Sequence, residues 1–206
     1  MRTIEQIQAH KIQIKARRDF KARNKKKSTK KAKDRTKIQG GALLIVCGLF
    51  EFFKIKVGED LEKSPSNQKA AILLGVLLDF QFLLKSKNVG ETQLMEWMKK
   101  GMKFLEERKK HRGKKKLEEE QFTREEQNKT KIQGGGLLII AGLFDYFEIK
   151  VGEDLQTSLD GCQKSATLLG ALLELHQLLK GRSITNEQIK KWKDKGAKAF
   201  IGRKDD

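Results

Sequence analysis

The chain has 206 residues, of which 45 are Lys or Arg and 27 are Asp or Glu, so its formal net charge is +18 at pH 7. This length allows one domain or two small ones, and the large basic excess favours a polyanionic partner. No apolar run approaches the roughly 20 residues that a membrane span requires, so we expect no transmembrane segment. The N-terminus also lacks the apolar core of a signal peptide, and a cytoplasmic protein is the default expectation.

Most of the positive charge lies in two segments. Residues 1–35 carry 14 Lys or Arg against 3 Asp or Glu, and residues 108–121 carry 7 against 3. The segments 36–107 and 122–206 are nearly balanced, with 10 against 9 and 14 against 12. We therefore predict a basic N-terminal arm (1–35), a first domain (36–107), a charged connector (108–121) and a second domain (122–206).

The two nearly neutral segments repeat one another, and we call residues 36–107 the first repeat and residues 122–206 the second repeat. Residues 36–50 return as residues 130–144, beginning in both with Thr-Lys-Ile-Gln-Gly-Gly. Residues 55–61 return unchanged as residues 149–155, with the sequence Ile-Lys-Val-Gly-Glu-Asp-Leu. After a one-residue insertion, residues 73–79 match residues 168–174. Residues that serve a function common to both repeats should be present in each of them.

Helix signals occur in the same order in both repeats, and no strand pattern stands out. Thr123 and Glu126 have capping-box spacing, which predicts a helix that begins there and runs through the glycine pair to about Phe147. Phe122, just before the cap, is placed to staple the first turn. We expect the equivalent helix of the first repeat to extend backwards into the basic arm.

A second and a third helix are predicted in each repeat. The second begins after Ser64 and Pro65 in the first repeat and is apolar around much of its circumference. The third follows Gly90 or Thr185 and presents a tryptophan. The predicted fold class is all-α, with two tandem copies of a small three-helix module and a basic N-terminal arm. Because so small a unit has a marginal core, we expect the repeats to pack together as an intramolecular pseudo-dimer.

Glycines inside the predicted helices need a structural reason, since each costs about 1 kcal/mol relative to alanine. Residues seven apart share one helix face, and we interpret these glycines as the places where the first and second helices of a repeat cross closely. A phosphate-binding loop is disfavoured because no Lys-Ser/Thr follows the glycines. The predicted crossing residues are Gly41, Gly48, Gly75, Gly135, Gly142 and Gly170.

Few residues suggest catalysis or a cofactor. None of the three histidines has a counterpart in the other repeat, and Tyr146 aligns with Phe52. The two cysteines, Cys47 and Cys162, lack the paired spacing of a disulfide framework or a zinc site. We therefore expect a protein that is not an enzyme and has no catalytic residue, metal or cofactor.

One acidic pair is present in both repeats, at residues 59–60 and 153–154. Two adjacent carboxylates after a glycine could bind a cation. Turn capping is favoured, because charged turn residues are common and no further metal-binding side chain lies nearby.

The basic segments carry the strongest functional signal. Their charge suits binding to the phosphate backbone of DNA. The alternatives are a disordered tail that only aids solubility, and binding to an anionic membrane. Phe20 is the only aromatic residue in the arm, which argues against a stacking platform for single strands. We expect backbone contacts with little sequence preference. The candidate DNA-binding residues are Arg17, Arg18, Lys21, Arg23, Lys25, Lys26, Lys27, Lys30, Lys31, Lys33, Arg35, Lys37, Arg108, Lys109, Lys110, Arg112, Lys114, Lys115 and Lys116.

Two motifs of the second repeat resemble a known family. Residues 134–143 read Gly-Gly-Gly-Leu-Leu-Ile-Ile-Ala-Gly-Leu, and residues 168–174 read Leu-Leu-Gly-Ala-Leu-Leu-Glu. They are similar to motifs of the small conjugal transfer protein TraD of the Ti-plasmid type, in which a basic N-terminal helix comes first. The matching residues are Gly135, Gly136, Leu137, Ala141, Gly142 and Leu143, with Gly41, Leu43, Gly48 and Leu49 in the first repeat. The family's lysine before Ala-Gly-Leu is replaced by Val46 and Ile140.

The resemblance implies an accessory role in plasmid DNA processing, beside the relaxase at the transfer origin. Together with the basic arm, it favours a non-enzymatic DNA-binding accessory of conjugative transfer, with DNA and a relaxase or another transfer protein as partners. The alternative is a helical protein–protein adaptor whose basic tails serve only solubility or steering.

Overall fold

The computed structural model describes residues 4–87, 89–111 and 122–201, and each regular element in these ranges is a helix. The all-α prediction is confirmed, and the basic arm is indeed continuous with the first helix of the first repeat. In chain order the helices are α1 (Ile4–Val46), α2 (Leu49–Phe52), α3 (Ser66–Ser86), α4 (Glu91–His111), α5 (Arg124–Ile140), α6 (Leu143–Tyr146), α7 (Leu159–Lys180) and α8 (Asn186–Ile201).

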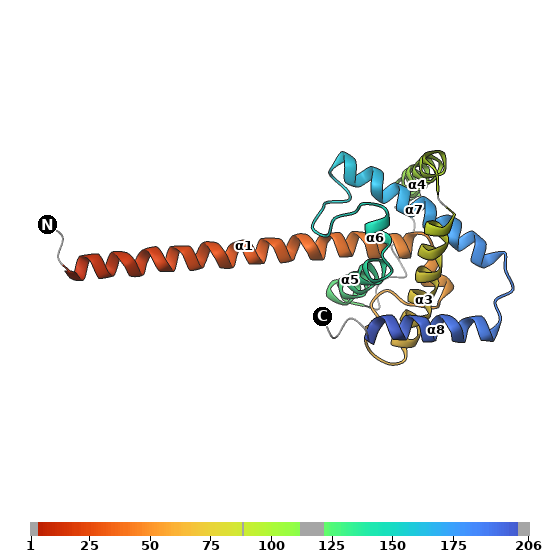
Figure 1. Cartoon of the computed structure of the whole chain (residues 1–206), viewed down its shortest axis with the longest axis horizontal. Helices are drawn as coiled ribbons and strands as arrows, with labels where there is room; N and C mark the ends of the chain where they lie inside the picture. Colours follow the sequence, from red (N-terminus) through yellow and green to blue (C-terminus); the bar gives the residue numbers. More distant parts are fainter. Residues whose placement is uncertain (1–3, 88, 112–121, 202–206) are drawn as a thin grey trace.

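The helix α1 has two parts with different surroundings. Its N-terminal part projects alone from the molecule, whereas its C-terminal part runs between the other helices (Figure 1). The change comes near Thr36, which is fully buried, and Leu43 and Leu44 are buried further along. One helix therefore joins a solvent-exposed arm rigidly to the core.

The remaining helices pack in pairs that join the two repeats. The helix α1 packs against α5, α3 against α8, and α4 against α7 (Figure 1). Each pair takes one helix from each repeat, and the buried apolar residues of both repeats form one continuous core. The compact three-helix module expected for each repeat is therefore not confirmed. Each repeat packs its third helix on the second helix of the other repeat.

Glycines allow the first helices of the two repeats to touch backbone to backbone. A Cβ atom on Gly41 of α1 would overlap the carbonyl oxygen of Lys131 in α5. Reciprocally, a Cβ atom on Gly135 would overlap the carbonyl oxygen of Lys37. Any larger residue would hold the two helices apart.

The other two pairs are built in the same way, with a glycine on each helix. In the α3–α8 pair, Gly75 faces the carbonyl of Trp192, and Gly196 faces that of Ala71. In the α4–α7 pair, Gly170 faces the carbonyl of Trp97, and Gly101 faces that of Ala166. The predicted glycines at 41, 75, 135 and 170 thus do lie at close crossings, but these crossings join different repeats rather than two helices of one repeat.

Gly48 and Gly142, predicted to lie at helix crossings, have a different role. Their φ angles are +83° and +69°, a left-handed conformation that side-chain-bearing residues avoid. Each follows the end of a long helix and precedes a helix of one turn, α2 or α6. The helix predicted to run to about Phe147 therefore ends at Ile140, because the chain turns at Gly142.

Neighbouring glycines in α5 provide a test of the crossing. We predict that Gly135→Ala lowers the free energy of unfolding by about 3 kcal/mol, since the added methyl group forces α1 and α5 apart. Gly136→Ala is the control, because no described atom outside its own helix lies within 4 Å of its added Cβ. This substitution should gain up to about 1 kcal/mol of helix stability. Urea unfolding followed by circular dichroism measures both. Equal effects of the two substitutions would contradict the backbone contact.

Candidate nucleic-acid interface

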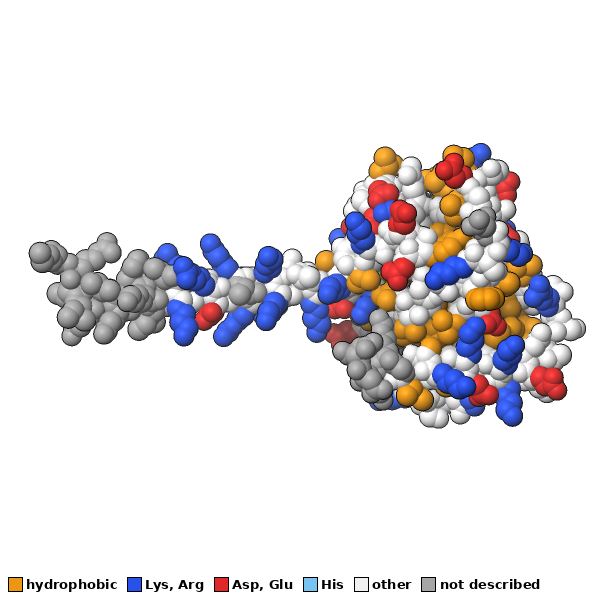
Figure 2. Space-filling model, in the orientation of Figure 1, with side chains coloured by type: hydrophobic (Ala, Val, Ile, Leu, Met, Phe, Trp, Pro, Cys, Tyr) orange, Lys and Arg blue, Asp and Glu red, His pale blue; other side chains and the backbone are white. Residues whose placement is uncertain are grey.

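The projecting part of α1 is covered with basic side chains. Figure 2 shows Lys and Arg side chains standing out on both sides of this helix as it leaves the body. At about 1.5 Å per residue, the stretch from residue 4 to residue 31 is about 40 Å long. The candidate residues of α1 before Arg35 are all exposed: Arg17, Arg18, Lys21, Arg23, Lys25, Lys26, Lys27, Lys30, Lys31 and Lys33.

The basic residues of α1 surround the helix instead of forming one stripe. A helix turns by about 100° per residue, so consecutive lysines such as Lys25, Lys26 and Lys27 point in three different directions. Lysines four residues apart, such as Lys26 and Lys30, lie on one face and repel each other. A polyanion that follows the helix would relieve this repulsion on every side.

These side chains have few protein partners. In the described part of α1, no ion pair involves a basic side chain between Lys15 and Lys33. Arg35 differs, because its guanidinium lies 2.8 Å from the carboxylate of Asp154. We therefore assign Arg35 to the contact between repeats instead of to the DNA-binding set. Lys37, also in that set, is half-buried at the crossing with α5.

The second basic patch is described only in part. Arg108, Lys109 and Lys110 are exposed in the last turns of α4. Cations at the C-terminal end of a helix also interact favourably with its dipole, so these residues have a structural use as well. The other predicted members, Arg112, Lys114, Lys115 and Lys116, lie outside the described residues.

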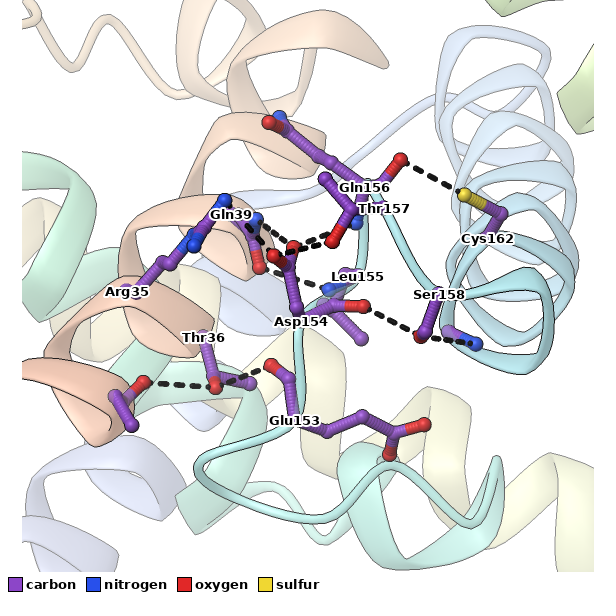
Figure 3. Close-up of polar contacts among 12 residues, drawn as sticks. Arg35, Thr36, Gln39, Glu153, Asp154, Leu155, Gln156, Thr157, Ser158 and Cys162 are labelled. Atoms are coloured by element: carbon purple, nitrogen blue, oxygen red, sulfur yellow. Dashed lines mark hydrogen bonds and ion pairs between the residues drawn. The ribbon is translucent and has the colours of Figure 1, made fainter. Parts of the chain in front are cut away.

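The base of the arm is fixed by hydrogen bonds from α1 to a loop of the second repeat (Figure 3). The buried hydroxyl of Thr36 donates to the carbonyl of Glu153 (2.6 Å) and accepts from the amide of Gly152 (2.9 Å). The Gln39 side chain accepts from the amide of Leu155 (2.9 Å) and donates to Asp154 (2.8 Å). These bonds fix the direction in which α1 leaves the body.

The same bonds recur with the roles of the repeats exchanged. Thr130 of α5 donates to the carbonyl of Glu59 (2.7 Å) and accepts from the amide of Gly58 (2.9 Å). Gln133 accepts from the amide of Leu61 (2.9 Å) and donates to Asp60 (2.7 Å). We call both sets together the reciprocal lock. Sequence reasoning missed it, although two polar residues repeated unchanged inside an apolar motif were the available signal.

The acidic pairs cap turns and anchor this lock. The Asp60 carboxylate accepts from Lys129 (2.6 Å) and from the amide of Glu62 (3.2 Å), and Asp154 accepts from the amide of Gln156 (3.0 Å). The hydrogen bonds from Lys129 and then Gln133 lower the pKa of Asp60 to about 2. Those from Thr157 and Gln39 lower the pKa of Asp154 in the same way. The turn-capping interpretation thus agrees with the structure.

Three further side chains with reactive groups, Cys47, His176 and Tyr146, pack against neighbouring residues. Burial raises the pKa of the Cys47 thiol to about 12, which keeps it protonated. Burial lowers the pKa of His176, whose ring forms a T-shaped pair with the ring of Phe52. The Tyr146 hydroxyl points to the carbonyl of Leu84, at 3.5 Å. Among the described residues, no group of three or more His, Cys, Asp or Glu could hold a metal ion, and no helix is long and apolar enough to cross a membrane.

Fold and charge thus define an all-α protein with a duplicated core and a basic helical arm. Comparison with known proteins narrows this class: residues 121–202 match the model of a family described as conjugal transfer protein TraD. The matched region contains α5, α6, α7 and α8, which form the second repeat. No curated protein and no solved structure matches the chain.

The reciprocal lock can be tested at its two threonines. We predict that Thr36→Val or Thr130→Val each lowers the free energy of unfolding by about 1–3 kcal/mol, because valine has the same shape but leaves a loop amide and a carbonyl unpaired. Thr29→Val, on the exposed part of α1, should change stability little. Thermal and urea unfolding measure the stability of the three variants. An equally large loss of unfolding free energy in Thr29→Val would argue against the lock.

The low pKa of Asp60 predicts acid sensitivity. A carboxyl group whose pKa is lowered by folding stabilises the protein above the pKa of the unfolded chain, about 4, and this contribution disappears as the pH falls towards about 2. Urea unfolding midpoints should therefore fall across this window, and less steeply in Asp60→Asn than in the parent. Asp19→Asn, on the exposed arm, should reproduce the parent's slope. Parallel curves for all three proteins would refute the assignment.

Proposed function

We propose that this chain is a non-enzymatic DNA-binding accessory protein of conjugal transfer, acting with the relaxase at the transfer origin. The family match of the second repeat suggests the role in conjugal transfer. The observation that supports DNA binding is the projecting helix, whose exposed basic side chains have no ion-pair partners between Lys15 and Lys33 in the described part of the arm. Such a helix offers phosphates charge on every side.

The binding mode follows from the shape of the arm. The major groove of B-DNA admits one α-helix, and basic side chains around that helix would then reach the phosphates of both strands. Phosphate contacts set position and orientation but carry no sequence information, so the expected binding has little sequence preference. Because the reciprocal lock fixes the base of α1, DNA on the arm would sit at a defined angle to the body, and the body would be free to contact a protein.

A second candidate function, a protein–protein adaptor, is favoured by two exposed apolar side chains of the first repeat whose counterparts in the second repeat are polar. Phe82 on α3 and Met95 on α4 are 67% and 57% exposed. Their counterparts in the second repeat are the polar residues Gln177 and Lys190. Phenylalanine offers a partner a large apolar contact area, and methionine adapts readily to a partner's surface. Both functions can coexist in one accessory protein.

DNA binding is tested by changing charge in matched sets. We predict that five Lys→Gln changes in the arm weaken binding to a labelled duplex of roughly 30 base pairs about 100-fold or more, and reduce the slope of log affinity against log salt by up to about 4. Five Lys→Gln changes on the body remove the same charge and should have a much smaller effect. The arm set is Lys25, Lys26, Lys27, Lys30 and Lys31, and the body set is Lys54, Lys56, Lys63, Lys85 and Lys87, all exposed.

Fluorescence anisotropy over a salt series measures both sets, and a variant lacking residues 1–35 completes the comparison. Equal losses in the arm and body sets would show that only net charge matters. No binding by the parent at moderate salt would reject the DNA-binding proposal and leave the adaptor function.

A further inference from the structure

The reciprocal lock places the two equivalent loops in the same conformation. Gly58 and Gly152 have φ angles of +114° and +112°, and each donates its amide to the threonine of the facing helix. The residues around them are identical in sequence, Ile-Lys-Val-Gly-Glu-Asp-Leu. The two loops therefore have the same backbone surface at Gly58 and at Gly152.

Among the described residues, only one of these surfaces is covered. A Cβ atom on Gly58 would overlap the Phe122 ring, which precedes α5 and lies on this glycine. A Cβ atom on Gly152 would meet no atom of the other described residues within 4 Å, its chain neighbours apart. The residue that aligns with Phe122 is Ser28, in the middle of α1, and none of its atoms lies within 4 Å of a Cβ on Gly152.

The uncovered position is an open groove between α1 and the loop, which we call the Gly152 groove. Its walls include Ser28 and Lys33 from α1 and Lys150 and Val151 from the loop. Val151 is 38% exposed, so the groove leaves part of an apolar side chain in contact with water. An aromatic ring would cover this surface as the Phe122 ring covers its equivalent.

The charge around the groove points to an acidic occupant. Two carboxylates line it, Glu153 and Asp160, but Lys164 pairs with both, at 3.4 Å and 2.6 Å. Lys33 and Lys150 have no ion-pair partner among the described residues. At the covered loop, Gln127 aligns with Lys33 and Glu126 aligns with Ala32, so α5 presents less positive charge there than α1 presents to the open groove.

We propose that the Gly152 groove binds a protein segment in which an aromatic residue follows a run of acidic residues. The chain itself contains such a segment, because Phe122 follows Glu-Glu-Glu-Gln at residues 118–121. The ring would lie on Gly152 and Val151, and the carboxylates would face Lys33 and Lys150. This proposal rests on the comparison of the two loops and does not depend on DNA binding by the arm.

The test uses the full chain and a labelled peptide with the sequence of residues 118–126, Glu-Glu-Glu-Gln-Phe-Thr-Arg-Glu-Glu. Fluorescence anisotropy should detect saturable binding, weakened about tenfold or more when the peptide's phenylalanine is replaced by alanine. Lys150→Glu should weaken binding at least about fivefold. Lys56→Glu, at the equivalent position of the covered loop, should leave it unchanged. Ser28→Trp, which fills the groove from the exposed face of α1, should abolish it.

The outcomes separate the possible occupants. Circular dichroism and melting temperatures that match the parent show that the variants are folded, as expected for three exposed positions. Absence of saturable peptide binding, equal affinity of the alanine peptide, or equal losses in the two lysine variants would each overturn the proposal. If Lys150→Glu weakens duplex binding while the peptide does not bind, the groove belongs to a nucleic-acid surface instead.

Discussion

The close contact of helix backbones across the two repeats is the constraint on which the rest of the structure depends. At each of the three crossings, a glycine on each helix faces a backbone carbonyl oxygen of the other helix. Such contacts exclude side chains, so the helices of a pair cannot separate slightly and still pack well. Because each pair takes one helix from each repeat, neither repeat can bury its apolar surface alone. The duplication is therefore part of the fold.

The reciprocal lock extends this constraint to the loops and to the arm. Thr36 and Gln39 occupy the turn at which α1 passes from solvent into the core, and they satisfy backbone groups of the other repeat. A helix of like charges would be poorly stabilised on its own, since its lysines repel one another. Its buried C-terminal part supplies the nucleus from which the exposed part continues. The core thus determines where the arm begins and which way it points.

Local signals predicted much of this architecture, and tertiary pairing explains what they missed. The capping box at Thr123 and the all-α class follow from residue spacing and are present. Sequence could not assign α8 to α3, because the two repeats carry the same pattern and a glycine fits a crossing within or between them equally well. Gly48 was misassigned for a related reason: a glycine at a crossing and a glycine in a left-handed turn look alike in sequence. Thr36 was overlooked because its partners are backbone atoms of a distant loop.

The sequence first suggests that functional residues are those present in both repeats, but the structure indicates the opposite. The identical residues of the two repeats, such as Thr36 and Thr130 or Gly41 and Gly135, are those that each repeat needs to hold the other. A reciprocal contact must be present twice, whatever the protein does. A binding surface needs to exist only once, and the features that suit a partner are those in which the repeats differ: the long basic extension of α1, the exposed Phe82 and the open groove above Gly152. Identity between the repeats therefore marks the scaffold, and the differences between them mark the surfaces on which function should be sought.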